Sequence, residues 1–135
     1  MQADAVRISY LSIFTRDVAA LPDFYIAVFG LEEVETSRSD RYRELIVGAL
    51  KLGFPSVDAY RGLDMADQAD PTGVRSMPTF AVDSAEAVAR LTGRAVQHGA
   101  RLVKGPFPTH FGQVLSVLLD PEGNALRISA AITAP

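Results

Sequence analysis

The chain of 135 residues contains no cysteine. This absence excludes disulfides, thiolate metal sites and cysteine nucleophiles. No apolar run approaches the roughly 18 residues that a membrane-spanning helix needs. The first residues, MQADAVRISY, lack the charged and then apolar pattern of a signal peptide. We therefore expect a soluble, cytoplasmic protein.

The chain also lacks a large excess of either positive or negative charge. The formal net charge is −3, and the 13 Lys and Arg residues are scattered along the chain. This distribution argues against nucleic acid or an anionic membrane as a partner. The sequence has no phosphate-binding glycine loop, no G-x-S-x-G nucleophile elbow and no H-E-x-x-H pair. With 48% hydrophobic residues, the chain has the size and composition of a single domain, residues 1–135, with a buried core.

The first part of the chain is typical of a strand, a helix and three further strands. Residues 6–14 are rich in β-branched and aromatic side chains, which favours a strand. Asp17 is a candidate N-cap for a helix that ends at Gly30, and Pro22 either lies in its first turn or delays its start. Three short strands are predicted at residues 32–37, 43–47 and 50–54.

The same order of elements returns after a connector at residues 55–74, which is rich in Asp, Pro and Gly. A strand within SMPTFAVDS precedes a helix that begins after Ser84 and ends before Gly99. Three strands are then predicted at residues 101–104, 113–119 and 125–130.

The chain is therefore a repeat of two β-α-β-β-β modules, residues 5–54 and 75–130. Each helix is too short to be stable alone, so we expect it to pack its apolar side on the outer face of its own sheet. The fold class is then α+β, and the opposite faces of two curved sheets can enclose a cavity.

The stretch LLDPEGNALRIS predicts a tight turn between the last two strands. Asp120 is expected to bond the amides of the turn. Because successive strand residues point to opposite faces, Arg127 lies on the face opposite Leu126 and Ile128.

The chain resembles the vicinal oxygen chelate superfamily, which includes glyoxalase I, bleomycin resistance proteins and extradiol dioxygenases. The resemblance rests on ISYLSIFTRDVAALPDFYIAVFGLEEV in the first module, and on FAVDSAEAVARL and GPFPTHFGQVLSVLLDPEGNALRIS in the second. It implies a curved mixed sheet or half-barrel cup with helices on its outer face. Relatives of this size pair as homodimers, sometimes with modules exchanged between the chains, so a homodimer is expected.

In metal-dependent members, a histidine in the first strand and a glutamate in the last strand of each module hold a divalent ion. The resemblance places these positions at Tyr10, Lys51, Met77 and Arg127. A divalent ion prefers imidazole and carboxylate ligands, whereas lysine and arginine repel it and tyrosine is protonated at neutral pH. We therefore expect no metal cofactor, and the metal-dependent activities of the family are disfavoured.

The two cations on the floor of the cup have two interpretations. Burying Lys51 and Arg127 without partners is costly, so an anionic ligand can meet them, with Tyr10 as a stacking face or hydroxyl donor and Met77 as an apolar wall. Alternatively, the cup is wide and wet, and the cations are solvated or pair with acids such as Glu44. Both interpretations stay open at this point.

The two histidines have different settings. His98 lies at the end of a helix, where a surface role is expected. His110 lies in the loop GPFPTHFGQ, and in relatives the matching loop overhangs the pocket and contributes an aromatic side chain, here Phe111. His110 is a candidate pocket contact or general base, or it lies on the loop surface.

Three functions follow. The favoured one is a metal-free protein that binds a small aromatic or acidic molecule through Tyr10, Lys51, Met77, Arg127, His110 and Phe111. The alternatives are a divergent lyase, isomerase or dioxygenase-type enzyme, and an interaction module with a filled-in cup.

Overall fold

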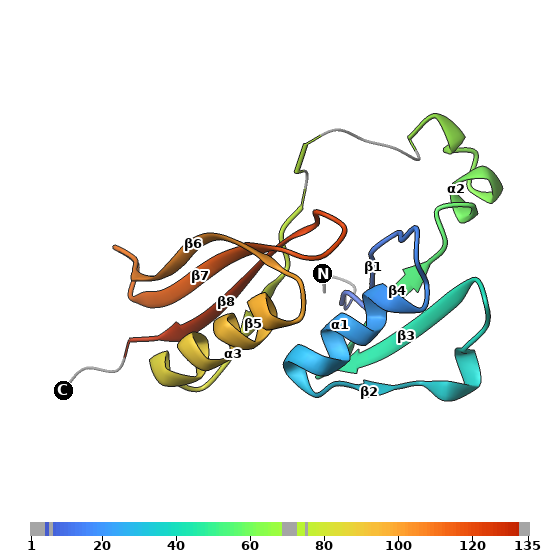
Figure 1. Cartoon of the computed structure of the whole chain (residues 1–135). Helices are drawn as coiled ribbons and strands as arrows, with labels where there is room; N and C mark the ends of the chain where they lie inside the picture. The colour runs from blue at the N-terminus through green and yellow to red at the C-terminus, as the bar shows by residue number, and fades with distance from the viewer. Residues whose placement is uncertain (1–4, 6, 69–72, 75, 133–135) are drawn as a thin grey trace, which may run out of the picture. The chain divides into compact units, whose positions relative to one another are not determined.

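A computed structural model describes residues 5, 7–68, 73–74 and 76–132 of the chain. The chain forms two compact units, each with a four-stranded open sheet and one longer helix (Figure 1). The α+β fold of two β-α-β-β-β modules is therefore confirmed. The first unit contains β1 (Tyr10–Ser12), α1 (Ala20–Phe29) except its last three residues, which group with the second unit, β2 (Glu32–Glu33), β3 (Tyr42–Val47) and β4 (Leu50–Pro55). The second contains β5 (Thr79–Ala81), α3 (Ala85–Gln97), β6 (Arg101–Pro108), β7 (Gln113–Leu119) and β8 (Ala125–Ala131).

The two sheets have the same topology. The strand order is β1-β4-β3-β2 in sheet 1 and β5-β8-β7-β6 in sheet 2. In each sheet the first strand pairs in parallel with the last, and the other neighbours are antiparallel. Short segments lie between the modules at α2 (Ala59–Gly62) and the 3₁₀ turn Ala66–Gln68. Residues 69–72 of the predicted connector lie outside the described residues.

Helix α1 covers one face of sheet 1. Its side chains at helical spacing, Leu21, Phe24, Tyr25 and Val28, are buried. The Tyr25 ring lies 5.4 Å from that of Phe54 on β4, measured between centroids. The helix ends at Gly30, whose φ of 65° is the left-handed conformation that glycine adopts without strain.

A buried arginine fixes the start of α1 to sheet 1. Arg43 on β3 is 3% exposed, and its guanidinium donates to Asp23 at 2.8 Å and to both carboxylate oxygens of Glu33 at 2.7 and 3.0 Å. It also donates to the carbonyl of Ala19 at 2.8 Å. The hydrogen bonding from Arg43 to Glu33 is the main reason that the pKa of Glu33 is lowered. Arg43 therefore holds strand β3, strand β2 and helix α1 together.

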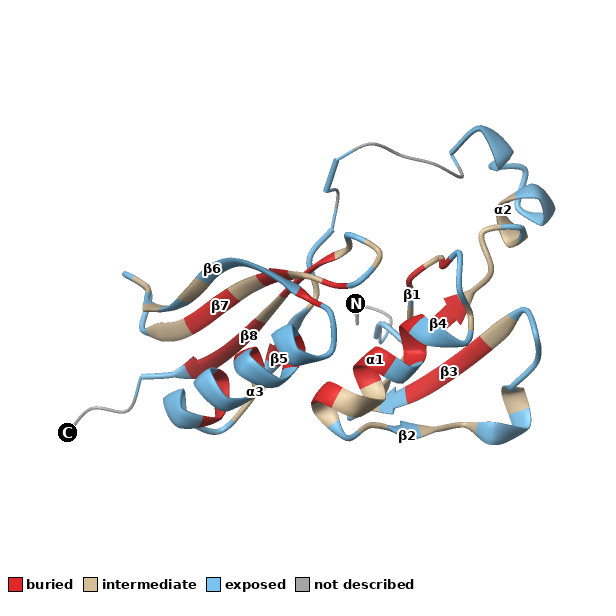
Figure 2. Cartoon of the chain, in the orientation of Figure 1, coloured by how far each residue is buried: buried red, intermediate tan, exposed pale blue. Residues whose placement is uncertain are grey.

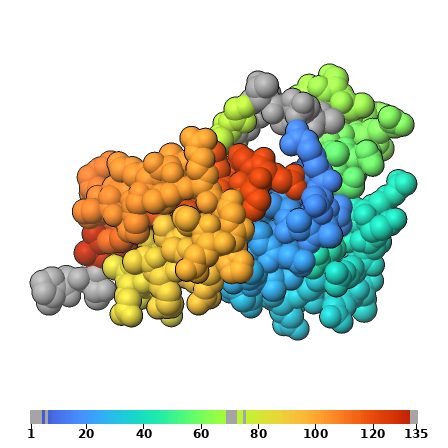
Figure 3. Space-filling model, in the orientation of Figure 1, coloured from blue at the N-terminus to red at the C-terminus, as the bar shows by residue number. Residues whose placement is uncertain are grey.

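Helix α3 covers one face of sheet 2 in the same way. Ser84 accepts a hydrogen bond from the Ala87 N–H at 3.1 Å, which confirms the predicted N-cap. Val88, Thr92 and Ala95 are buried, and the Thr92 hydroxyl meets that of Ser116 on β7 at 2.7 Å. Figure 2 shows the buried residues on the sheet side of α3, while its outer side belongs to the surface drawn in yellow to orange in Figure 3.

The tight turn between β7 and β8 also forms as predicted. The Asp120 carboxylate accepts from the Glu122 N–H at 2.9 Å and from the Asn124 N–H at 3.0 Å. Gly123 has a φ of 87°, a conformation that favours glycine.

Several predicted boundaries are wrong. The strand predicted at 32–37 is only two residues long, because the chain turns into the 3₁₀ segment Glu35–Ser37. The first strand spans Tyr10–Ser12, and Val6 lies outside the described residues. Helix α1 begins three residues after Asp17, although the Asp17 carboxylate caps the preceding turn by accepting from the Ala19 and Ala20 N–H groups. Strand β6 extends past 104 to Pro108 as an edge strand with register shifts, a position that tolerates proline.

In the part of the chain that the structure describes, every helix falls short of the length and apolar character needed to cross a membrane.

The Arg43 contacts generate a stability prediction. Replacing Arg43 by Met leaves the Glu33 carboxylate, which is 10% exposed, without its principal partner. We expect the free energy of unfolding to fall by about 3 kcal/mol. Arg38→Met is the matched control, because Arg38 reaches Glu33 at 3.7 Å from a side chain that is 53% exposed. That change is expected to cost less than about 1 kcal/mol. Urea unfolding followed by circular dichroism measures both, and equal losses would contradict the role assigned to Arg43.

Candidate functional site

The strand registers define equivalent positions in the two modules. Tyr10 on β1 is paired with Lys51 on β4, and Thr79 on β5 is paired with Arg127 on β8. The Lys51 N–H donates to the Ser9 carbonyl at 3.0 Å, and the Arg127 N–H donates to the Pro78 carbonyl at 2.9 Å. Lys51 and Arg127 are therefore equivalent by register, and so are Tyr10 and Thr79.

The register corrects one assignment made from sequence. Met77 was assigned to the position equivalent to Tyr10, but that position is Thr79. Met77 lies two residues earlier, before β5 begins. Met77 was placed by counting back from FAVD, and that count ends two residues before the residue that pairs with Arg127, because the sequence does not specify the register of β5 against β8.

Sheet 1 carries a polar cluster on the face opposite α1, which we call its helix-free face. Glu44 on β3 is opposite Gly53 on β4, so it lies on the same face as Lys51 and away from the buried Leu45 and Leu52. Its carboxylate lies 3.8 Å from the Lys51 ammonium and its side chain is only 6% exposed, against 43% for Lys51. The Lys51 ammonium lies 5.5 Å from the centroid of the Tyr10 ring. Lys51 thus has a protein acid as its partner, as one of the two interpretations of this residue expected.

Tyr42 completes this cluster, and Gly53 makes room for it. A Cβ atom at position 53 would lie 2.6 Å from the Tyr42 hydroxyl oxygen, a distance that such atoms do not tolerate. The hydroxyl donates a hydrogen bond to Glu44. Burial, the hydrogen bond to Glu44 and the negative charge of that residue, in this order of size, together raise the pKa of Tyr42 to about 12. Tyr42 is therefore a neutral hydrogen-bond donor at physiological pH.

Sheet 2 has a different environment on its own helix-free face, the one opposite α3. Arg127 is partly exposed, and its Nε donates to the Thr79 hydroxyl at 3.0 Å. Val117 on β7 is directly opposite Arg127, and Lys104 on β6 is opposite Val117. The Lys104 ammonium lies 3.8 Å from the centroid of the Phe107 ring. This face therefore combines cationic and apolar side chains.

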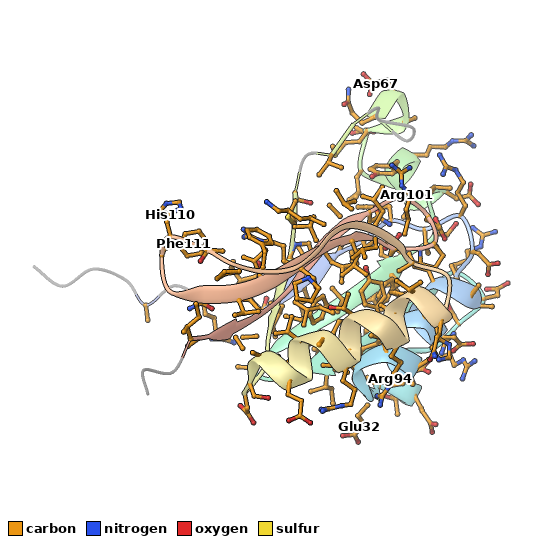
Figure 4. The ribbon with its side chains drawn as sticks, turned by 60° about the vertical axis from the view of Figure 1, so that its left-hand side comes forward. Glu32, Asp67, Arg94, Arg101, His110 and Phe111 are labelled. Atoms are coloured by element: carbon orange, nitrogen blue, oxygen red, sulfur yellow. The ribbon has the colours of Figure 1, made fainter. Side chains whose placement is uncertain are left out.

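The two loop candidates are far from Arg127 within the second unit. His110 and Phe111 are exposed at the tip of the β6–β7 hairpin, where their rings meet edge to face at 5.2 Å (Figure 4). Arg127 is opposite Val117, which lies four strand residues, or roughly 13 Å, from Gln113, and Phe111 lies beyond Gln113 in the turn. No described carboxylate bonds to His110 to orient it as a base. His98 is exposed at the end of α3, as predicted.

The positions that hold a metal ion in metal-dependent relatives do not fit one here. With the register corrected, they carry Tyr10, Lys51, Thr79 and Arg127. Two of these are cationic, and a tyrosine and a threonine hydroxyl are weak substitutes for imidazole. Across the described residues, no group of three or more His, Asp or Glu side chains is arranged to hold a metal ion.

The sequence reasoning missed Tyr42, Gly53, Thr79 and Lys104. Tyr42 and Glu44 alternate with Arg43 and Leu45 along β3, and a glycine inside a predicted strand can indicate a close approach of another group. These two signals together point to the cluster. Thr79 and Lys104 depend on strand registers, which the sequence does not specify.

Comparisons with known proteins place the chain in a family. A family model described as the Glyoxalase/Bleomycin resistance protein/Dioxygenase superfamily matches residues 7–128. A crystal structure of a glyoxalase/bleomycin resistance protein/dioxygenase family enzyme from Burkholderia phytofirmans PsJN is 40% identical. The match covers 92% of this chain and 98% of that chain with a TM-score of 0.89. The chain therefore belongs to the glyoxalase/bleomycin resistance protein/dioxygenase superfamily.

More distant structures share the fold. A glyoxalase-related enzyme from Fulvimarina pelagi is 21% identical with a TM-score of 0.76, and covers 92% of this chain and 87% of that chain. A lactoylglutathione lyase from Agrobacterium tumefaciens is 19% identical with a TM-score of 0.71, and covers 94% of this chain and 95% of that chain. The search of curated proteins found no match.

The environment of Tyr42 predicts an unusual titration. Because the pKa of Tyr42 is raised, the neutral hydroxyl contributes in full to the free energy of unfolding below pH 10. This contribution is lost as the pH rises through about 12. In protein labelled with ¹³C at the tyrosine Cζ, the Tyr42 signal should remain that of the neutral phenol at pH 10.5. Glu44→Gln should lower the pKa of Tyr42 but leave it above 10, because burial persists. The Tyr42→Phe spectrum assigns the signal, and a wild-type midpoint at or below pH 10 would refute the description of this cluster.

Proposed function

We propose that this protein binds a small acidic or aromatic molecule and does so without a divalent metal ion. The single observation that carries the proposal is the chemistry at the four register-defined positions, Tyr10, Lys51, Thr79 and Arg127. Tyr10 and Thr79 carry hydroxyl groups that can donate hydrogen bonds, and the two cations are unsuited to ligating a divalent ion. Lys51 has Glu44 as its partner, whereas Arg127 bonds to a neutral hydroxyl and can bind an oxyanion. The family's metal-dependent reactions have no ion-binding set of residues to act through at these positions.

Aromatic and apolar side chains on the same faces support an organic ligand. Tyr10 is 48% exposed beside Lys51, and Phe107 is partly exposed beside Lys104. Small-molecule sites combine apolar contact, which supplies most of the affinity, with a few polar groups that orient the ligand. The expected homodimer and cytoplasmic location stay predictions.

The absence of a required metal ion can be tested directly. We expect metal analysis of protein purified without chelator to give far less than one equivalent of zinc, nickel, manganese or iron. The melting temperature should change by less than about 1 °C with EDTA or with any of these ions, since a ligand stabilises a fold only when it binds the native state. A fall of several degrees with EDTA that one ion restores would overturn the metal-free part of the proposal.

Ligand binding can be tested with a thermal-shift panel of benzoates, phenols, naphthalene derivatives and their neutral analogues. A ligand at 100 times its Kd stabilises the native state by about 2.7 kcal/mol, which corresponds to a rise of about 10 °C for a chain of this size. Arg127→Ala should abolish most of the rise. Arg90→Ala, an exposed arginine on α3, is the control and should retain it. A panel with no stabilising compound would favour the interaction module instead.

A further inference from the structure

The strands of the two sheets differ in charge although their registers match. The strands of sheet 2 carry three cations, Arg101, Lys104 and Arg127, and contain no aspartate or glutamate. The strands of sheet 1 carry the cations Arg43 and Lys51 together with the acids Glu32, Glu33 and Glu44. Both cations of sheet 1 form ion pairs with these acids. Among described residues, none of the three sheet 2 cations has an ion-pair partner.

Two of the sheet 2 cations lie on either side of one apolar residue. Arg127, Val117 and Lys104 form a row across β8, β7 and β6. Residues directly opposite one another in antiparallel strands project to the same side of the sheet. Neighbouring strands lie about 4.8 Å apart, so about 10 Å separates the backbones of Arg127 and Lys104. Both side chains are long enough to reach one group that lies above Val117.

The two cationic side chains of this row can donate further hydrogen bonds. Arg127 uses its Nε for the Thr79 hydroxyl, which orients the plane of the guanidinium, and no described residue bonds to either of its terminal nitrogens. A guanidinium in this state can bind an oxyanion through two parallel hydrogen bonds. Lys104 is exposed and lies over the Phe107 ring, so an aromatic surface borders the same row. The row thus offers positive charge with apolar contact beside it.

From these observations, and resting on the proposed function, we infer that the acidic group of the ligand binds between Arg127 and Lys104 on sheet 2, and not at Lys51. The ligand class is an organic acid with one carboxylate, sulfonate or phosphate and an apolar body that contacts Val117 and Phe107. Lys51 contributes no net charge to this recognition, because the buried Glu44 neutralises it at 3.8 Å. Equivalent positions in the two modules therefore have different roles.

The test compares two probes that share a shape but differ in charge, 2-naphthoate and its neutral analogue 2-naphthamide. Isothermal titration calorimetry gives the Kd of each, and the ratio of the two measures charge recognition. We expect the wild-type protein to bind naphthoate at least 10-fold more tightly than naphthamide. Arg127→Gln and Lys104→Gln should each reduce the ratio at least three-fold, and the double variant should bring it near one.

Two further variants make the test specific. Arg90→Gln, on the exposed side of α3, should leave the ratio unchanged. Lys51→Gln should preserve the ratio whatever it does to the affinity for both probes. Urea unfolding of every variant establishes that it is folded at the assay temperature, and Lys51→Gln is expected to have a lower urea midpoint than the wild type because it removes the cation beside the buried Glu44.

The outcomes separate this inference from the proposed function. A ratio near one in the wild type, a ratio that survives the double variant, or a ratio that collapses in Lys51→Gln would each overturn the inference while ligand binding stands. Failure of both probes and of the whole thermal-shift panel to bind the wild type would overturn the proposed function, and the inference with it.

Discussion

A single short helix can bury only one face of a four-stranded sheet, and this limit determines what each module exposes. In each unit the apolar side chains of alternate strand positions face the helix, among them Leu45 and Phe54 in sheet 1 and Leu118 and Ile128 in sheet 2. The intervening positions are free from that packing requirement. They carry Glu44, Lys51, Lys104 and Arg127 beside apolar residues such as Val117, and so the same periodicity that builds the core also supplies the candidate binding surfaces.

Much of the fold could be predicted because its signals are local. The Ser84 cap, the glycine after α1 and the Asp120 turn depend on side chains that bond their own neighbouring backbone, so each can be recognised in a few residues. The candidate site was harder to predict from the sequence. The assignment of Met77 failed because the residue opposite Arg127 depends on a register across β5 and β8, which are separated by more than 40 residues. Tyr42 was missed because its importance depends on the absence of a side chain at Gly53.

The two modules show how a repeated backbone can diverge in chemistry. Lys51 and Arg127 have the same register and the same type of backbone hydrogen bond, yet Lys51 faces a buried carboxylate and Arg127 faces a threonine hydroxyl. The charge of the neighbouring strand makes the difference, since β3 contributes Glu44 where β7 contributes only uncharged residues. A resemblance at the level of the fold therefore gives the position of each side chain but not its electrostatic partner.

The contact between Gly53 and the Tyr42 ring has a consequence for how this lineage can change. A single methyl group added to the β4 backbone would act as a wedge under the phenol and separate it from the carboxylate of Glu44. That carboxylate would then have the ammonium of Lys51 as its remaining partner in the cluster. A substitution at position 53 would therefore change the interactions of the Glu44 carboxylate, although neither Glu44 nor Tyr42 is itself replaced.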